Sequence, residues 1–154
     1  MTVEKVVDIE VFTDEDKALT DEDILNMPED EYMSPLQLEF FRLKLVAHEK
    51  EILDNAKKTT QAFQEQETNY IADPSDRATI EEEYALELRT RDRERKLLQK
   101  VRKALSLIEN GDYGFCEDTG EPIGLKRLIA RPTASLTIEA QERREKMQKH
   151  FAED

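Results

Sequence analysis

The sequence predicts a mainly α-helical protein whose largest element is a long antiparallel coiled-coil hairpin. Two observations carry this prediction. No glycine occurs between residues 34 and 110, and apolar residues recur there at alternating steps of three and four, which is the pattern of a coiled-coil seam. The link between the two helical stretches, near Pro74, is very short, so the helices must run antiparallel. A small globular module and a C-terminal helix are expected to follow.

The composition agrees with a small core between long helices. Of 154 residues, 38% are hydrophobic and 38% are charged, with no tryptophan, and such a chain cannot fill a large globular core. The net charge of -13 argues against general duplex binding, which needs clustered cations, and favours a partner with a basic surface. The sequence has no signal-peptide pattern, no apolar run long enough to cross a bilayer and only one cysteine. These features predict a cytoplasmic protein with no membrane contact.

Helix-start signals divide the chain. Residues 1–33 are predicted to be an acidic, partly flexible segment with one short helix, since Thr20-Asp21-Glu22-Asp23 has the order of a capping box. Ser34 and Pro35 begin the hairpin, with Gln37 able to reach back to the cap. Asp73 and Pro74 repeat this start, so residues 34–110 form the hairpin with its tip at 72–78. The second helix is expected to end at Asn110-Gly111, where glycine can adopt a left-handed conformation.

The seam of the hairpin is predicted to be apolar near its base and polar toward its tip. Toward the tip the pattern thins to Thr59, Phe63, Ile80 and Tyr84. The expected seam residues of the base are Leu38, Phe41, Leu45, His48, Ile52, Leu98, Val101, Leu105 and Ile108.

Residues 111–136 are rich in turns and are predicted to form a small irregular module, followed by a final helix over 137–154. Thr137 can cap that helix with its hydroxyl. The candidate core of the module is Phe115, Ile123, Leu125, Leu128, Ile129 and Leu136.

The module has the spacing of a zinc finger without its ligands. Tetrahedral structural zinc takes four thiolate or imidazole ligands, typically from two Cys-x-x-Cys pairs. Here Cys116 and Thr119 stand at the first pair, and Thr137 and Ala140 stand at the second. A lone thiol cannot hold structural zinc, so we expect a degenerate zinc-finger-like module that binds no metal. Cys116 is then either a small packed thiol, which we favour, or a redox sensor without a resolving partner.

Several segments, in order, resemble the DksA/TraR family. The resemblance begins near Tyr32 and extends into the C-terminal helix. It rests on Asp73-Pro74-Ser75-Asp76-Arg77-Ala78, on the basic run from Glu87 to Lys96, on Asp112-Tyr113-Gly114-Phe115-Cys116, and on Ile123-Gly124-Leu125-Lys126-Arg127-Leu128-Ile129-Ala130-Arg131-Pro132-Thr133-Ala134.

The resemblance implies a bacterial transcription factor that binds RNA polymerase directly. Members insert their hairpin into the secondary channel of the polymerase and, with the alarmone ppGpp, regulate initiation in the stringent response without reading a DNA sequence. It implies that Asp73, Asp76 and Ala78 form the tip that approaches the polymerase active centre. From the residues alone, capping by Asp73 with Asp76 in the first turn explains this spacing equally well. We expect the chain to act as a monomer.

The resemblance also implies a ppGpp site shared with the polymerase. Arg93, Leu97, Lys100 and Arg131 match family positions near the alarmone, whereas Gln141 stands where well-studied members carry lysine. Arginine suits phosphate because its guanidinium makes two-point contacts. The simpler interpretation of the basic run is a solvated helix face, paired at four-residue spacing as in Glu87–Arg91 and Asp92–Lys96.

An enzymatic function is not expected, because no nucleophile–base set, phosphate loop or metal cluster is visible in the sequence. The alternative is a secondary-channel factor that acts on elongation or transcript cleavage, or a coiled-coil adaptor.

Overall fold

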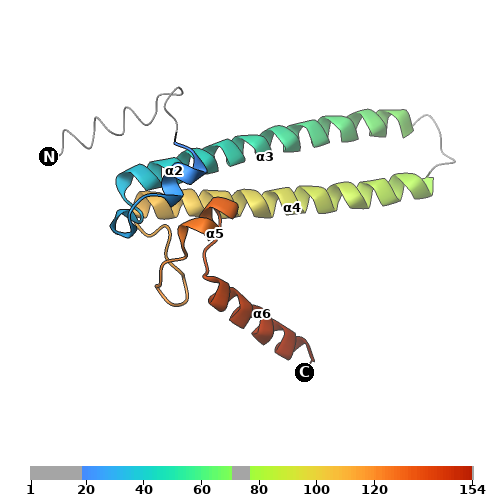
Figure 1. Cartoon of the computed structure of the whole chain (residues 1–154). Helices are drawn as coiled ribbons and strands as arrows, with labels where there is room; N and C mark the ends of the chain where they lie inside the picture. The colour runs from blue at the N-terminus through green and yellow to red at the C-terminus, as the bar shows by residue number, and fades with distance from the viewer. Residues whose placement is uncertain (1–18, 71–76, 154) are drawn as a thin grey trace. The chain divides into compact units, whose positions relative to one another are not determined.

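The protein is mainly helical, and the predicted fold class, a long antiparallel hairpin with a small module and a C-terminal helix, is confirmed (Figure 1). The computed structural model describes residues 19–70 and 77–153. Residues 1–18 and most of the tip at 72–78 therefore lie outside the described residues, and the flexibility expected of the N-terminal segment stays a prediction there. The elements in chain order are α2 (Asp21–Leu25), the 3-10 helix η2 (Glu29–Glu31), α3 (Pro35–Tyr70), α4 (Arg77–Asn110), α5 (Leu125–Ala130) and α6 (Ile138–Glu153).

The chain forms two compact units. The outer hairpin, Val46–Lys103, is one unit, and the residues on either side of it, 1–45 and 104–154, form the other. The domain boundaries expected from the sequence stay a prediction. None of the helices within residues 19–70 and 77–153 has the length and apolar character that a membrane span requires.

In the outer hairpin, α3 and α4 run side by side in opposite directions (Figure 1). Ile52 is buried in the seam, and Glu49 on α3 accepts a hydrogen bond from Arg102 on α4 at 3.4 Å. Along α4, the predicted four-residue pairs are present. Arg91 Nε lies 3.2 Å from Glu87, and Lys96 Nζ lies 3.0 Å from Asp92. At least part of the basic run is therefore a paired, solvated face.

The helix ends of the other unit follow local rules. Thr20 and Asp23 form the predicted capping box, since Thr20 Oγ1 accepts from the Asp23 N–H at 3.2 Å and Asp23 accepts from the Thr20 N–H at 3.0 Å. At the end of α4, Gly111 has φ of 79° and donates to Ile108, while Asp112 donates to Leu107. These two bonds form a Schellman motif, in which glycine takes the left-handed position.

The start of α3 differs in one detail from the prediction. Ser34 Oγ accepts from the Gln37 N–H at 3.4 Å, as a cap does. The Gln37 side chain, however, accepts from the N–H of Met33 at 2.9 Å rather than reaching the backbone of Ser34. The reason is that the Ser34 N–H already donates to the Glu31 carbonyl, because η2 leads directly into α3.

The core of this unit lies where the base of the hairpin meets the module. Phe41 on α3 and Tyr113, just after α4, pack with ring centroids 5.6 Å apart, and both are buried. Gly114 has φ of 93°, and a Cβ there would lie 2.6 Å from the Met33 sulfur. Only glycine therefore allows the module to approach this closely without displacing Met33.

The prediction for the module is wrong in two respects. Residues 125–130, expected as short apolar pieces, form helix α5, which packs on α2. Leu125, Leu128 and Ile129 have the three- and four-residue spacing of one helix face. Phe115 is 40% exposed rather than a core residue, since its ring contacts Tyr32 edge-on at the surface. Ile123, Leu128 and Leu136 are buried as expected, whereas Leu125 and Ile129 are half-buried.

Candidate functional site

The four positions with zinc-finger spacing lie together in the folded module. The turn that carries Cys116 and Thr119 closes through the Gly120 N–H, which donates to the Cys116 carbonyl at 2.9 Å. Thr137 precedes the first residue of α6, and its hydroxyl lies 3.8 Å from the Cys116 sulfur. The same hydroxyl accepts from the Ala140 N–H at 3.2 Å, which is the predicted cap. Cys116, Thr137 and Ala140 are buried, and Thr119 is exposed.

Hydrogen-bond donors surround the Cys116 thiol. Burial raises the pKa of this thiol, but the Thr119 hydroxyl and the backbone N–H groups of Thr137, Thr119 and Asp118 lower it by more, so that its pKa is about 7. This pKa is below the usual range of a free thiol, close to 8.5. The Thr119 hydroxyl and these backbone N–H groups thus favour the thiolate form of Cys116.

These residues do not fit a structural zinc ion. Ala140 has no donor atom, and the Thr137 hydroxyl is already engaged with Ala140 and Cys116. Zinc needs four nitrogen, sulfur or carboxylate ligands, and this arrangement supplies one. Elsewhere in the described ranges, no group of three or more His, Cys, Asp or Glu side chains has a geometry that could hold a metal ion.

An ion pair joins the two segments that a metal would join. Arg144 on α6 contacts Asp118 through two bonds, with Nε at 2.9 Å from Oδ2 and Nη2 at 2.5 Å from Oδ1. The Arg144 guanidinium lowers the pKa of the Asp118 carboxyl, and Asp118 raises the pKa of Arg144. A bidentate arginine–carboxylate pair fixes orientation as well as distance. Together with the Thr137 cap, it connects the Cys116 turn to α6.

Two tyrosines hold the rest of the module, and sequence reasoning missed both. The Tyr32 hydroxyl donates to the Gly114 carbonyl at 2.6 Å and accepts from the Gly124 N–H at 3.0 Å. The Tyr113 hydroxyl donates to the Pro132 carbonyl at 2.7 Å. Tyr32 lies just before α3, so it ties the N-terminal segment to the module. A local signal exists only for Tyr113, which stands beside Gly114, whereas no glycine stands near Tyr32 in the sequence.

The tip carboxylates Asp73 and Asp76 lie outside the described residues, so their role stays a prediction. Ala78, the second residue of α4, is exposed.

The residues expected near ppGpp are divided between the two compact units. Arg93, Leu97 and Lys100 lie on one face of α4, at steps of four and three residues. Arg93 and Lys100 are exposed, and Leu97 is half-buried. Arg131 is exposed at the C-terminal cap of α5, in the other unit. The role of these residues in a shared site stays a prediction.

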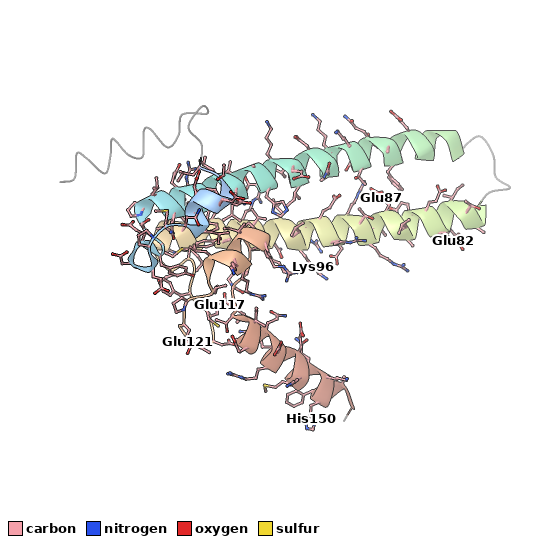
Figure 2. All side chains as sticks on the ribbon, viewed as in Figure 1. Glu82, Glu87, Lys96, Glu117, Glu121 and His150 are labelled. Carbon is pink, nitrogen blue, oxygen red and sulfur yellow. The ribbon has the colours of Figure 1, made fainter. Side chains whose placement is uncertain are left out.

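Figure 2 shows how the charged side chains are distributed along α4. Glu87 lies on the side of α4 that faces α3, and its side chain is only 15% exposed. Lys96 leaves the helix on the other side and is 69% exposed. The Gln141 amide on α6 donates to Glu145 at 3.0 Å. A neutral amide engaged in this way cannot supply the charge of a lysine at the same position.

The fold and the site define a helical-hairpin protein that carries a zinc-finger-type module with three of its four ligand positions replaced. Two family models cover these parts. The model of "DnaK suppressor protein DksA, N-terminal domain" matches residues 37–108, and the model of "Prokaryotic dksA/traR C4-type zinc finger" matches residues 111–146.

Individual relatives match most of the chain. It is 51% identical to an RNA polymerase-binding transcription factor DksA of Caulobacter vibrioides, over 82% of this chain and 89% of the relative. It is 45% identical to that of Escherichia coli K12, over 81% and 82%. The solved structure of transcription factor DksA2 from Pseudomonas aeruginosa has 40% identity and a TM-score of 0.78, and the match covers 85% of this chain and 100% of that one. The chain therefore belongs to the DksA/TraR family.

Proposed function

We propose that the chain is a transcription factor that binds RNA polymerase through its secondary channel and, with ppGpp, regulates initiation. The observation that carries the proposal is a continuous helical hairpin in a chain that is 51% and 45% identical to relatives named for binding RNA polymerase. Its role is regulatory rather than catalytic, it reads no DNA sequence, and it acts as a monomer in the cytoplasm.

The hairpin contributes length to the proposed function. Helices α3 and α4 have 36 and 34 residues, so each spans about 50 Å at about 1.5 Å per residue. An uninterrupted helix holds its length without help from a loop, and two paired helices resist bending better than one. This geometry suits delivery of a short connection deep into a narrow channel of a larger protein.

The tip residues act on the polymerase active centre. The sequence Asp73-Pro74-Ser75-Asp76 has the order of a capped helix start, and such a start would hold both carboxylates in place. They perturb the mobile elements of the active centre or the surroundings of its magnesium, while the small Ala78 permits close approach. A modest change in the energy of the open promoter complex shifts output differently at promoters that start from different equilibria.

Arginine and lysine side chains contribute this chain's half of the ppGpp site. Arg93, Lys100 and Arg131 provide cations for the phosphates, and Leu97 provides an apolar contact. Because the polymerase provides the other half, the free protein binds ppGpp poorly. With Gln141 in place of a lysine, the response to ppGpp is weaker than in a member that carries the lysine.

The module works without zinc. The Asp118–Arg144 pair, the Thr137 cap and the tyrosine anchors are direct protein contacts that connect its parts. Its function is to contact the polymerase exterior and set the depth of insertion.

Reconstituted transcription with purified polymerase tests the proposal. Asp73→Asn and Asp76→Asn keep a capping side chain but remove charge, and Glu82→Gln is the matched control, since Glu82 is an exposed carboxylate on α4 outside the tip. We expect the tip variants to lose regulation of initiation by about tenfold while polymerase affinity stays within about threefold. The control should behave as wild type, and ppGpp should strengthen the wild-type effect.

Three outcomes would contradict the proposal. Full regulation by both tip variants at unchanged affinity would remove the tip from the mechanism. Stimulated RNA cleavage without an effect on initiation would favour the elongation or cleavage factor, and absence of polymerase binding would favour the coiled-coil adaptor.

A further inference from the structure

The seam of the outer hairpin becomes polar beyond Ile52. Ile52 is 6% exposed, but no side chain among the described residues 53–65 and 78–100 is fully buried. Apolar side chains that insert between residues of the facing helix are what fix the register of paired helices. Over this stretch, the seam lacks such buried anchors.

A groove of about 240 Å³ lies beside this part of the seam. Ile52, Ala56 and Leu98 are among its apolar lining residues, and Arg91 and Arg95 also line it. Side chains of both helices therefore border open space at this level.

One cluster, formed by Phe63, Tyr84, Glu87 and Arg91, connects the two helices farther out. The rings of Phe63 on α3 and Tyr84 on α4 have centroids 5.0 Å apart at an angle of 59°. The Arg91 guanidinium lies 5.4 Å from the centroid of the Phe63 ring, and Glu87 holds Arg91 Nε at 3.2 Å. Two residues of α4, Tyr84 and Arg91, thus contact one ring from α3, and Glu87, at spacings of three and four from them, holds Arg91.

The position of the Phe63 cluster is symmetric along the hairpin. Helix α3 ends at Tyr70 and α4 begins at Arg77, so Phe63 and Tyr84 each lie seven residues from the helix end. Seven residues correspond to about 10 Å of helix. Sliding one helix by a single turn would separate the two rings by about 5 Å and break the contact.

We propose that the Phe63 cluster fixes the register of the outer hairpin and thereby positions the tip, so that its four members are positioning residues. Buried Ile52 and Val101 set the register of the two continuous helices nearer the base, but no fully buried side chain among the described residues 53–65 and 78–100 maintains it farther out. The aromatic pair and the cation over the Phe63 ring hold the outer seam in that register. The consequence for the tip rests on the proposed function, whereas the register itself is a property of the free chain.

The free protein tests the register. Spin labels at the exposed positions Gln61 and Thr79, in a Cys116→Ser background, report the separation of α3 and α4. We expect a narrow distance distribution in the wild-type sequence and a broader one in Phe63→Ala. In unlabelled protein, Phe63→Ala should lower the amide protection of residues 53–65 and 78–90 by about tenfold. Leu86→Ala is the matched control, since Leu86 is 58% exposed on α4. The exchanged variant Phe63→Tyr/Tyr84→Phe should restore the wild-type behaviour.

Transcription tests the consequence. At saturating protein, Phe63→Ala should retain polymerase affinity within about threefold but lose about fivefold or more of its maximal effect, with restoration by the exchanged variant. A contact that only stabilised the fold would lower affinity and leave the maximal effect unchanged.

Each remaining result has one meaning. An unaltered distance distribution in Phe63→Ala, or equal broadening in Leu86→Ala, overturns the proposal. If the chain does not bind polymerase, the proposed function fails, and the distance measurements still decide whether the cluster fixes the register.

Discussion

Removal of the Tyr32 hydroxyl separates the contribution of one long-range anchor from that of packing. In Tyr32→Phe the ring remains, and with it the edge-on contact with Phe115 at 5.8 Å. The variant loses two hydrogen bonds, one that the hydroxyl donates to the Gly114 carbonyl and one that it accepts from the Gly124 N–H. The variant should therefore weaken the connection between the N-terminal segment and the module without creating a cavity.

The magnitude follows from the partners left behind. The Gly114 carbonyl keeps a second donor, the Ile123 N–H at 2.9 Å, so its loss is small. The Gly124 N–H loses the Tyr32 hydroxyl, and a half-buried donor without its acceptor costs about 1 to 2 kcal/mol. We expect the free energy of unfolding to fall by about 1.5 kcal/mol. For a chain of this size, that lowers the melting temperature by about 3 to 6 °C.

Urea unfolding followed by the near-ultraviolet circular dichroism of the tyrosines measures this change, because the chain has no tryptophan. Peptide-level amide exchange over residues 113–128 assigns it to the module. Tyr84→Phe is the control, since it removes a hydroxyl from a ring that is 47% exposed in the other compact unit. If Tyr32→Phe changes the stability by no more than this control, the assignment of Tyr32 as an anchor is wrong.

The difference in the free energy of unfolding between wild type and Tyr32→Phe should also depend on pH. Burial raises the pKa of the Tyr32 hydroxyl, although hydrogen bonds with the backbone of Gly124 and Ile123 lower it in part. A folded pKa above the unfolded value near 10 means that the stabilisation is complete below about pH 10 and is lost as the pH rises further. The two proteins should therefore become more alike above about pH 10, whereas a constant difference would contradict this cause.

Three further predictions concern the Cys116 turn and α6. Thr137→Ala should cost about 1 kcal/mol of stability by removing the helix cap, whereas Thr137→Ser, which keeps the hydroxyl, should cost less in the same thermal melts. Asp118→Asn should be less stable than wild type at pH 7. This difference in stability should vanish as the pH falls below about 4, because Arg144 lowers the pKa of Asp118 and the stabilisation is lost when Asp118 is protonated. A difference that persists at pH 2 would argue against the ion pair. A strong chelator should leave the circular dichroism and the melting temperature unchanged, and stoichiometric zinc in a tag-free sample that unfolds with chelator would refute the zinc-independent module.

The helical part of the protein could be predicted because its signals are local. A capping box joins Thr20 to Asp23, and the pair of Glu87 and Arg91 spans four residues. Each such signal lies within one helical turn, so it is visible in a short stretch of sequence. The seam residues Phe41, Leu45, Ile52 and Val101, expected from their spacing, are buried.

The candidate site was predictable only as a set of positions. Spacing identified Cys116, Thr119, Thr137 and Ala140 as one set, and the capping role of Thr137 followed from its hydroxyl. The sequence alone could not assign the partners of this set, since Arg144 lies 26 residues from Asp118. Many other cations stand at comparable distances along the chain.

Tertiary structure alone decided what holds the module to the base of the hairpin. Tyr32 contacts residues 82 and 92 positions away, and no periodicity records such a pairing. Helix α5 formed from a stretch expected to be irregular, since its apolar face packs on α2 rather than on its own neighbours in sequence. Backbone preferences act over a few residues and can be inferred from them, whereas contacts between distant residues exist only once the chain has folded.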